Sequence, residues 1–200
     1  MKKYLSRGFT MIELLIVIAV LGILAVAVLA AINPIEQINR GRDTGTRSDA
    51  EQLIGAIDRY YASKGYYPWM LSATSDNDFV DFVEIAAVDQ AIGGDAQPML
   101  TNLSASGTEE VKLTFVNRIV AASANLLSIY KMTGGGYSTY LCFVPQSSSF
   151  RTEAYKRCVA DPTYGDLPAD FPTEACPAAS CTDVGADEPN LATACYSCLP

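Results

Sequence analysis

The pattern of hydrophobic positions begins with a long apolar run near the amino terminus. Residues Leu14 to Ile32 are nineteen consecutive residues without a charged or strongly polar side chain. As a helix that rises about 1.5 Å per residue, this run is roughly 28 Å long, close to the hydrocarbon thickness of a bilayer. Lys2, Lys3 and Arg7 precede it, and the next basic residue is Arg40. The positive-inside rule therefore predicts a single membrane pass, with the amino terminus in the cytoplasm and the bulk of the chain outside.

The helical pattern resumes after Pro34, which is the first proline, so any bend is expected near Asn33-Pro34. A polar stretch over residues 39–51 is followed by apolar residues at a spacing near 3.6, which are Leu53, Ile54, Ile57, Tyr60 and Tyr61. This pattern predicts an amphipathic continuation of the helix over residues 33–64, with its second half packed on a globular head. Gly65 and Pro68 are expected to end it.

Residues 65–157 are expected to form a small α+β head. The pattern predicts helices over residues 79–92, 108–122 and 150–159, capped by residues 76–78, by Thr108, and by Ser148 or Ser149. Two strands are predicted over residues 126–132 and 137–144. Gly134–Gly136 would join these strands as a β-hairpin, and Gly93-Gly94 would end the first of the three helices.

Composition and charge narrow the function. Half of the residues are hydrophobic and the mean hydropathy is +0.16, which excludes a chain that is disordered throughout. The 200 residues include no His, which removes the Ser-His-Asp triad, the Cys-His dyad and His-ligated zinc. No other pattern indicates a catalytic site, so we expect neither an enzyme nor a cofactor. The net charge of -8 argues against specific nucleic-acid binding.

Residues 158–200 contain no Lys or Arg and hold five of the six cysteines. Such a region has too little apolar surface to fold by burial alone, so disulfides are expected to order it. The candidates are Cys142, Cys158, Cys176, Cys181, Cys195 and Cys198. Cys142 lies late in a predicted strand and Cys158 in the next helix, which favours a Cys142–Cys158 pair. The other four cysteines can pair in three ways.

Zinc is the alternative for these cysteines. Cys176-x4-Cys181 and Cys195-x2-Cys198 are two pairs separated by thirteen residues, a spacing loosely like that of a zinc ribbon. An exported location argues against a metal, because an oxidising compartment does not keep thiolates reduced. We therefore expect no bound metal.

The residues that lead into the apolar run carry a motif. They read Arg7-Gly8-Phe9-Thr10-Met11-Ile12-Glu13-Leu14-Leu15-Ile16-Val17-Ile18. Glu13 is informative because a carboxylate costs about 2.5–3.5 kcal/mol at the centre of a membrane helix, and less near an interface. A plain signal anchor, or a secretory signal cut near Ala25–Ala27, has no use for it. The string strongly resembles the class III leader of type IV pilins and pseudopilins.

The resemblance implies a set of processing and assembly residues. Residues 1–8 would be a leader that prepilin peptidase removes by cutting after Gly8, followed by methylation of Phe9. The helix over residues 9–32 would span the membrane and then form the filament core. Glu13 of one subunit would meet the Phe9 amine of its neighbour and set the register. The fold implied is a pilin-like α+β fold, and a disulfide-bounded carboxy-terminal region is similar to that of many pilins.

The function implied is that of a structural subunit of a type IV pilus or related pseudopilus. The expected partners are copies of the chain, sibling pilins, prepilin peptidase and an inner-membrane assembly platform with its motor. The chain would lie in the inner membrane before assembly and in an extracellular or periplasmic filament afterwards. The alternative is a minor pilin or pseudopilin that acts as an adhesin or in DNA uptake or secretion.

Overall fold

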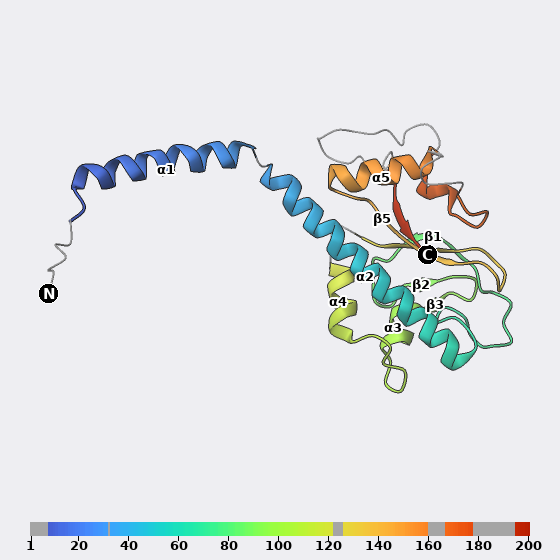
Figure 1. Cartoon of the computed structure of the whole chain (residues 1–200). Helices are drawn as coiled ribbons and strands as arrows, with labels where there is room; N and C mark the ends of the chain where they lie inside the picture. The colour runs from blue at the N-terminus through green and yellow to red at the C-terminus, as the bar shows by residue number, and fades with distance from the viewer. Residues whose placement is uncertain (1–7, 32, 122–125, 160–166, 178–194) are drawn as a thin grey trace, which may run out of the picture. The chain divides into compact units, whose positions relative to one another are not determined.

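The computed structural model describes residues 8–31, 33–121, 126–159, 167–177 and 195–200 (Figure 1). Its contacts divide the chain into two compact units, Met1–Ile38 and Asn39–Pro200. The first unit contains helix α1 (Met11–Ala31) and the first residues of helix α2 (Pro34–Lys64). The second contains the rest of α2 and an α+β head.

The interruption between α1 and α2 falls at Asn33-Pro34, where the sequence predicts it. Pro34 is the first residue of α2, a position that needs no backbone N–H and that suits the fixed φ of proline. The Asn33 Oδ1 atom accepts the N–H of Glu36 at 3.3 Å and caps the helix. At the other end, Gly65 has a φ of +78° and donates its N–H to the Tyr61 carbonyl at 2.8 Å, as a glycine C-cap does.

The head is built on a four-stranded antiparallel sheet with the order β1-β4-β5-β6. Its strands are Val80–Glu84 (β1), Ser128–Lys131 (β4), Thr139–Phe143 (β5) and Ser197–Leu199 (β6). The β4–β5 pair confirms the predicted hairpin, with Gly134–Gly136 in its loop. A separate two-stranded sheet joins Ala91–Ile92 (β2) to Gln97–Pro98 (β3).

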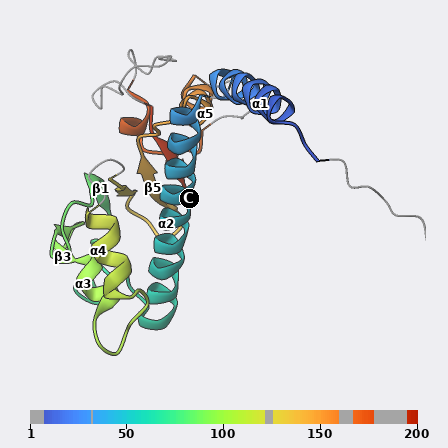
Figure 2. The same cartoon turned by 90° about the vertical axis from the view of Figure 1, so that its left-hand side faces the viewer.

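Three shorter helices complete the described part of the head. They are α3 (Met99–Ser104), α4 (Leu113–Ala121) and α5 (Ser148–Cys158), with a 3-10 turn η1 at Thr173–Ala175. Helices α3 and α4 lie beside α2 in both views of the chain (Figures 1 and 2).

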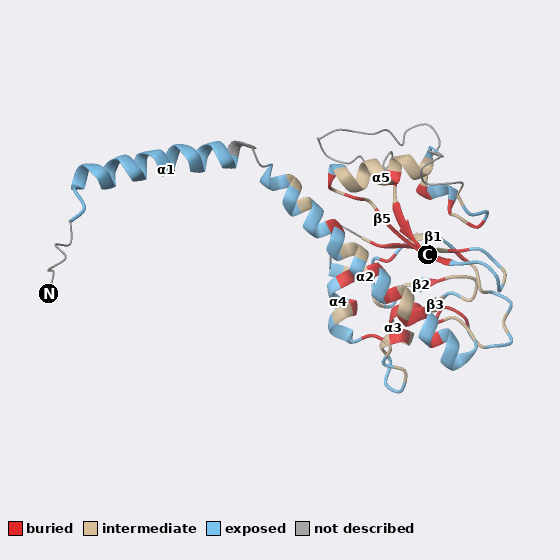
Figure 3. Cartoon of the chain, in the orientation of Figure 1, coloured by how far each residue is buried: buried red, intermediate tan, exposed pale blue. Residues whose placement is uncertain are grey.

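Strand β5 is buried along its whole length, and its alternating side chains belong to two separate clusters. Leu141 and Phe143 belong to the larger cluster, which also contains Leu53, Ile57 and Tyr60 of α2. The stripe predicted for the second half of α2 is therefore confirmed at these three positions. In Figure 3, α2 carries buried segments among exposed ones where it runs through the head.

The smaller cluster lies on the other face of β5 and includes part of the carboxy-terminal region. Tyr140 donates its hydroxyl to Asp170 Oδ1 at 3.0 Å, and the Ser138 N–H bonds Asp170 Oδ2 at 2.7 Å. Burial raises the pKa of Tyr140 to about 12, and the hydrogen bond to Asp170 adds to this shift. The contacts of Asp170 therefore attach residues 167–177 to β5.

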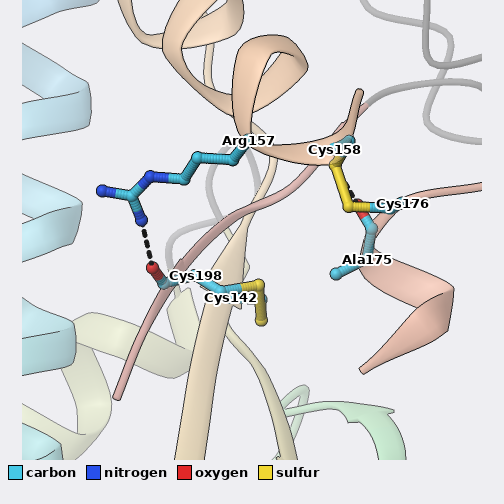
Figure 4. The surroundings of a disulfide bond; sticks show 6 residues. All are labelled: Cys142, Arg157, Cys158, Ala175, Cys176 and Cys198. Atoms are coloured by element: carbon cyan, nitrogen blue, oxygen red, sulfur yellow. Dashed lines mark hydrogen bonds between the residues drawn. A yellow bond between two sulfur atoms is a disulfide. The ribbon is translucent and has the colours of Figure 1, made fainter. Parts of the chain in front are cut away.

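Two disulfides between described residues hold the same region (Figure 4). Cys142 of β5 is bonded to Cys198 of β6, and Cys158 at the end of α5 is bonded to Cys176. The expected Cys142–Cys158 pair is therefore wrong. Strand β6 returns beside β5 and places Cys198 directly opposite Cys142 in the ladder, with their Cα atoms 4.0 Å apart.

The disulfides also bear on the zinc alternative. Cys176 and Cys198 are oxidised as described, and Cys195 is disulfide-bonded as well, so these three supply no thiolate. Cys181 lies outside the described residues. Among the residues that the structure describes, no group of three His, Cys, Asp or Glu side chains could hold a metal ion.

The predicted helix over residues 79–92 is wrong, because this segment contains β1 and β2. Strand β1 pairs antiparallel with β4, from Val80↔Lys131 to Glu84↔Ser128, and its register shifts between Val80 and Val83. The hydrophobic residues of the segment fit a helical spacing equally well. Long-range pairing, which no local pattern shows, therefore decides its structure.

The other two predicted helices exist with different starts. Helix α4 begins at Leu113, because Glu109 adopts a φ of +42°, which does not fit a first helical turn. The Thr108 hydroxyl, expected as the cap, bonds the Asn102 carbonyl at 2.8 Å instead. Helix α5 is capped by Ser147, one residue before the predicted caps.

A buried carboxylate joins α2 to the start of α5. Asp43 is fully buried, and it accepts the N–H of Gln146 at 2.9 Å, the N–H of Ser147 at 2.7 Å and the Ser147 hydroxyl at 2.6 Å. Ser147 in turn accepts the N–H of Phe150 and caps α5. Asp43 therefore supplies acceptors for two backbone N–H groups at the start of α5.

Substituting Asp43→Ala should lower the free energy of unfolding by about 3 kcal/mol, because it leaves two backbone N–H groups without acceptors. Thermal unfolding of the purified full chain, followed by near-UV circular dichroism, measures this loss. Asp58→Ala removes an exposed carboxylate from the same helix and serves as the matched control. Equal stability of the two variants would contradict the role of Asp43.

Candidate functional site

The residues around the expected cleavage point lie immediately before α1. Gly8, Phe9 and Thr10 are not helical, and all three are exposed. A Cβ atom added to Gly8 would meet no other atom within 4 Å. The peptide bond between Gly8 and Phe9 therefore lies in an open, non-helical stretch, which is the form in which a protease cleft binds a chain.

Thr10 and Glu13 close the first turn of α1 by bonding each other. The Glu13 Oε2 atom accepts the Thr10 N–H at 2.9 Å and the Thr10 hydroxyl at 2.6 Å. The Thr10 Oγ atom in turn accepts the Glu13 N–H at 3.3 Å. This reciprocal pair is a capping box, with Thr10 as the N-cap and Glu13 as the third helical residue.

The capping box has two consequences for Glu13. Both bonds to its carboxylate end on Oε2, so Oε1 carries no hydrogen bond from the described residues. Neither partner precedes Phe9, so a cut after Gly8 leaves the box intact. Thr10 was not among the expected site residues, although Thr-x-x-Glu before an apolar run is the signature of a capping box. The basic residues of the expected leader lie outside the described part of the chain: Lys2, Lys3 and Arg7.

Helix α1 has no side that faces a core. The segment Met11–Leu29 has a mean hydropathy of 3.1, and none of its side chains is buried (Figure 3). Its length and composition suffice for a membrane span. Apolar surface in water costs about 25 cal/mol per Å², so lipid or other helices must cover this one.

Two comparisons match parts of this chain to known proteins. Residues 4–29 match the model of the prokaryotic N-terminal methylation motif. Fimbrial protein EcpC from Eikenella corrodens is 35% identical to the chain over 92 residues, which are 44% of this chain and 59% of that protein. Both findings support a type IV pilin. The residues that match the methylation motif include Gly8, Phe9, Thr10 and Glu13.

The comparisons reach only part of the molecule. The chain spans 59% of the length of the fimbrial relative, and no solved structure matches it. The apolar amino-terminal helix, the antiparallel sheet of the head and the carboxy-terminal disulfides agree with the expected pilin-like α+β fold.

Substituting Thr10→Val removes the capping box and should loosen the first turn of α1. A lost N-cap costs about 1 kcal/mol, so the Glu13 amide hydrogen, which bonds the Thr10 Oγ atom, should exchange about fivefold faster. Hydrogen exchange of the full chain in detergent micelles, read by NMR, measures this rate. Thr44→Val is the control, since it removes a hydroxyl that bonds the Arg40 carbonyl inside α2 and should leave α1 unchanged. Unchanged exchange in Thr10→Val would refute the capping role.

Proposed function

We propose that the chain is a prepilin, the precursor of a filament subunit in a type IV pilus or related pseudopilus. The methylation motif and the fimbrial relative support a pilus subunit, which belongs to a structural family and not to a class of enzymes. The observation that carries the proposal is a capped apolar helix, exposed over Met11–Leu29, directly after the open Gly8–Phe9 bond.

Processing changes the charge at the tip of α1. Before assembly, the helix spans the inner membrane once, with Lys2, Lys3 and Arg7 on the cytoplasmic side. Hydrolysis of the Gly8–Phe9 bond by prepilin peptidase removes these three cations and leaves a new amine on Phe9. Methylation of an amine keeps its positive charge, so mature Phe9 remains a single cation at the end of an apolar rod.

Assembly covers α1 with other copies of itself and with sibling pilins, supported by an inner-membrane assembly platform. The Oε1 atom of Glu13 is available to the Phe9 amine of a neighbouring subunit. A buried carboxylate without a partner is unfavourable by several kcal/mol, so a copy in the wrong register is rejected. Apolar contact then supplies the attraction between subunits, and the Glu13 pair sets their register.

The processing step is tested by intact-mass spectrometry of the protein from its host envelope. The mature chain should start at Phe9 and carry one additional methyl group. A Gly8→Val variant should remain at full precursor length, since a β-branched residue replaces the glycine at the cleavage point. Gly22→Ala, inside α1 and with open space around it, should be processed normally. A native chain that keeps residues 1–8, or that begins beyond α1, would refute the proposal.

The register role is tested with Glu13→Gln. Glutamine also forms a capping box, so this variant removes the charge and keeps the cap. Loss of one partner of a buried pair costs about 3 kcal/mol or more, so the yield of sheared filaments should fall more than about tenfold while the membrane pool remains. Glu36→Gln removes the equivalent charge from the first turn of α2 and is the control. Wild-type filament yield from Glu13→Gln would rule out the pairing.

A further inference from the structure

One aromatic ring at the end of α2 is exposed and is held in place by a stack. Tyr61 and Tyr67 are stacked with ring centroids 4.5 Å apart, and Tyr67 and Trp69 with centroids 4.8 Å apart. Trp69 is fully buried and donates its indole N–H to the Asp78 carbonyl at 3.1 Å. Tyr61, which helical spacing places in the buried stripe, is instead 43% exposed at the outer end of the stack. Its ring is therefore ordered and yet accessible to a ligand.

A buried ion pair fixes the loop beside this stack. The Lys131 Nζ atom lies 4.9 Å from the Tyr67 ring centroid and 2.9 Å from Asp78 Oδ2. It also donates to the carbonyls of Met132 and Gly134, at 3.0 and 3.1 Å. The Asp78 carboxylate accepts the Gly134 N–H as well. These bonds attach the β4–β5 loop to the stack. They also occupy the N–H donors of Lys131 with acceptors of the protein itself.

A cavity of about 360 Å³ lies between the stack and the loop. Its lining includes Tyr61 and Tyr67 as well as Asp76, Thr133 and Gly134. The volume is within the range of small-molecule sites, which combine aromatic surface with a few polar groups. The carboxylate of Asp76 has no hydrogen bond or ion pair with any described residue, and no Lys or Arg lines the cavity.

The charges around the cavity limit which ligand fits. The lining holds the Asp76 carboxylate and no cation, so the site disfavours anions. Burial raises the pKa of Tyr67, and the nearby Tyr61, Asp78 and Asp58 raise it further. A quaternary ammonium ion needs open ring faces that surround it, whereas these rings are nearly parallel and Lys131 already occupies the cation position at Tyr67. A neutral molecule with one apolar face and a hydroxyl-bearing edge fits both the aromatic side and the polar side of the cavity.

We propose that this cavity binds the pyranose ring of a neutral sugar. The C–H face of the sugar stacks on Tyr61, its hydroxyls donate to the Asp76 carboxylate, and the Thr133 hydroxyl bonds a further oxygen. This site goes beyond the proposed filament function, because it gives the head of a pilus subunit a means to recognise glycans. It does not depend on α1 or on assembly.

Saturation-transfer difference NMR tests the site on the full chain in a detergent without a sugar headgroup. The probes are the methyl glycosides of glucose, galactose and N-acetylglucosamine. Tetramethylammonium represents the alternative class of ligand, a quaternary ammonium ion. At least one glycoside should bind. Tyr61→Ala should weaken it about tenfold, whereas Tyr61→Phe, which keeps the ring, should retain it. Asp76→Asn should weaken binding by removing an acceptor, and Leu113→Ala, an exposed apolar change on α4, should not.

Three results would overturn the proposal: no transfer to any glycoside, equal affinity in the wild-type chain and Tyr61→Ala, or transfer to tetramethylammonium alone. The fluorescence of Trp69, the chain's one tryptophan, reports whether the stack in each variant is intact. If Tyr61→Ala disturbs the stack, the Asp76→Asn variant tests the site in its place. Wild-type affinity of Asp76→Asn for the glycoside would then overturn the proposal. The protein is unassembled throughout this experiment. A failure to bind glycosides therefore does not contradict the proposed filament function, and a failure to assemble filaments does not contradict glycoside binding.

Discussion

The apolar surface of α1 is the constraint on which the rest of the molecule depends. No side of this helix packs on a core of its own chain, so a low-polarity environment has to come from outside it. A bilayer supplies that environment first, and other copies of the helix can supply it afterwards. The one carboxylate in the apolar helix, Glu13, bonds Thr10 in the first turn. Capping, charge and the proposed cleavage point therefore fall within six residues, Gly8 to Glu13.

The head has to be stable without help from α1. The second half of α2 supplies one wall of its core, and β5 contributes side chains to both faces of the sheet. The carboxy-terminal region has little apolar surface of its own, and its disulfides compensate at roughly 2–4 kcal/mol each. Arg157 adds a hydrogen bond from α5 to the Cys198 carbonyl at 3.2 Å, beside both disulfides (Figure 4). Cross-links and β5 together hold a region that burial alone would not.

The sequence predicts those parts of the fold that depend on neighbouring residues. The break at Asn33-Pro34, the glycine cap at Gly65 and the β4–β5 hairpin follow from local backbone chemistry, and the structure has all three. The strand β1 and the pairing of Cys142 with Cys198 depend on partners far along the chain, and local patterns gave the wrong answer for both. Strand β6 has only three residues, too few for any periodicity to show.

Features of the candidate sites that depend on neighbouring residues can also be predicted from the sequence, and those that depend on distant residues cannot. Gly8, Phe9 and Glu13 are recognisable because a leader motif is a continuous string. Thr10 is also recognisable from the sequence, since a capping box has a local spacing of three residues and Glu13 is its partner. The cavity beside Tyr61 was not predictable, because part of its polar wall comes from a loop about 70 residues further along the chain, at Thr133 and Gly134.

The most direct test of the central claim is a cryo-electron microscopy reconstruction of filaments from the protein's own host. The account predicts that each subunit starts at Phe9 and that α1 helices of neighbouring copies contact one another in the filament core. The Glu13 carboxylate should lie within hydrogen-bonding distance of a neighbour's Phe9 amine. A filament whose subunits lack α1, or expose it to solvent, would contradict the account.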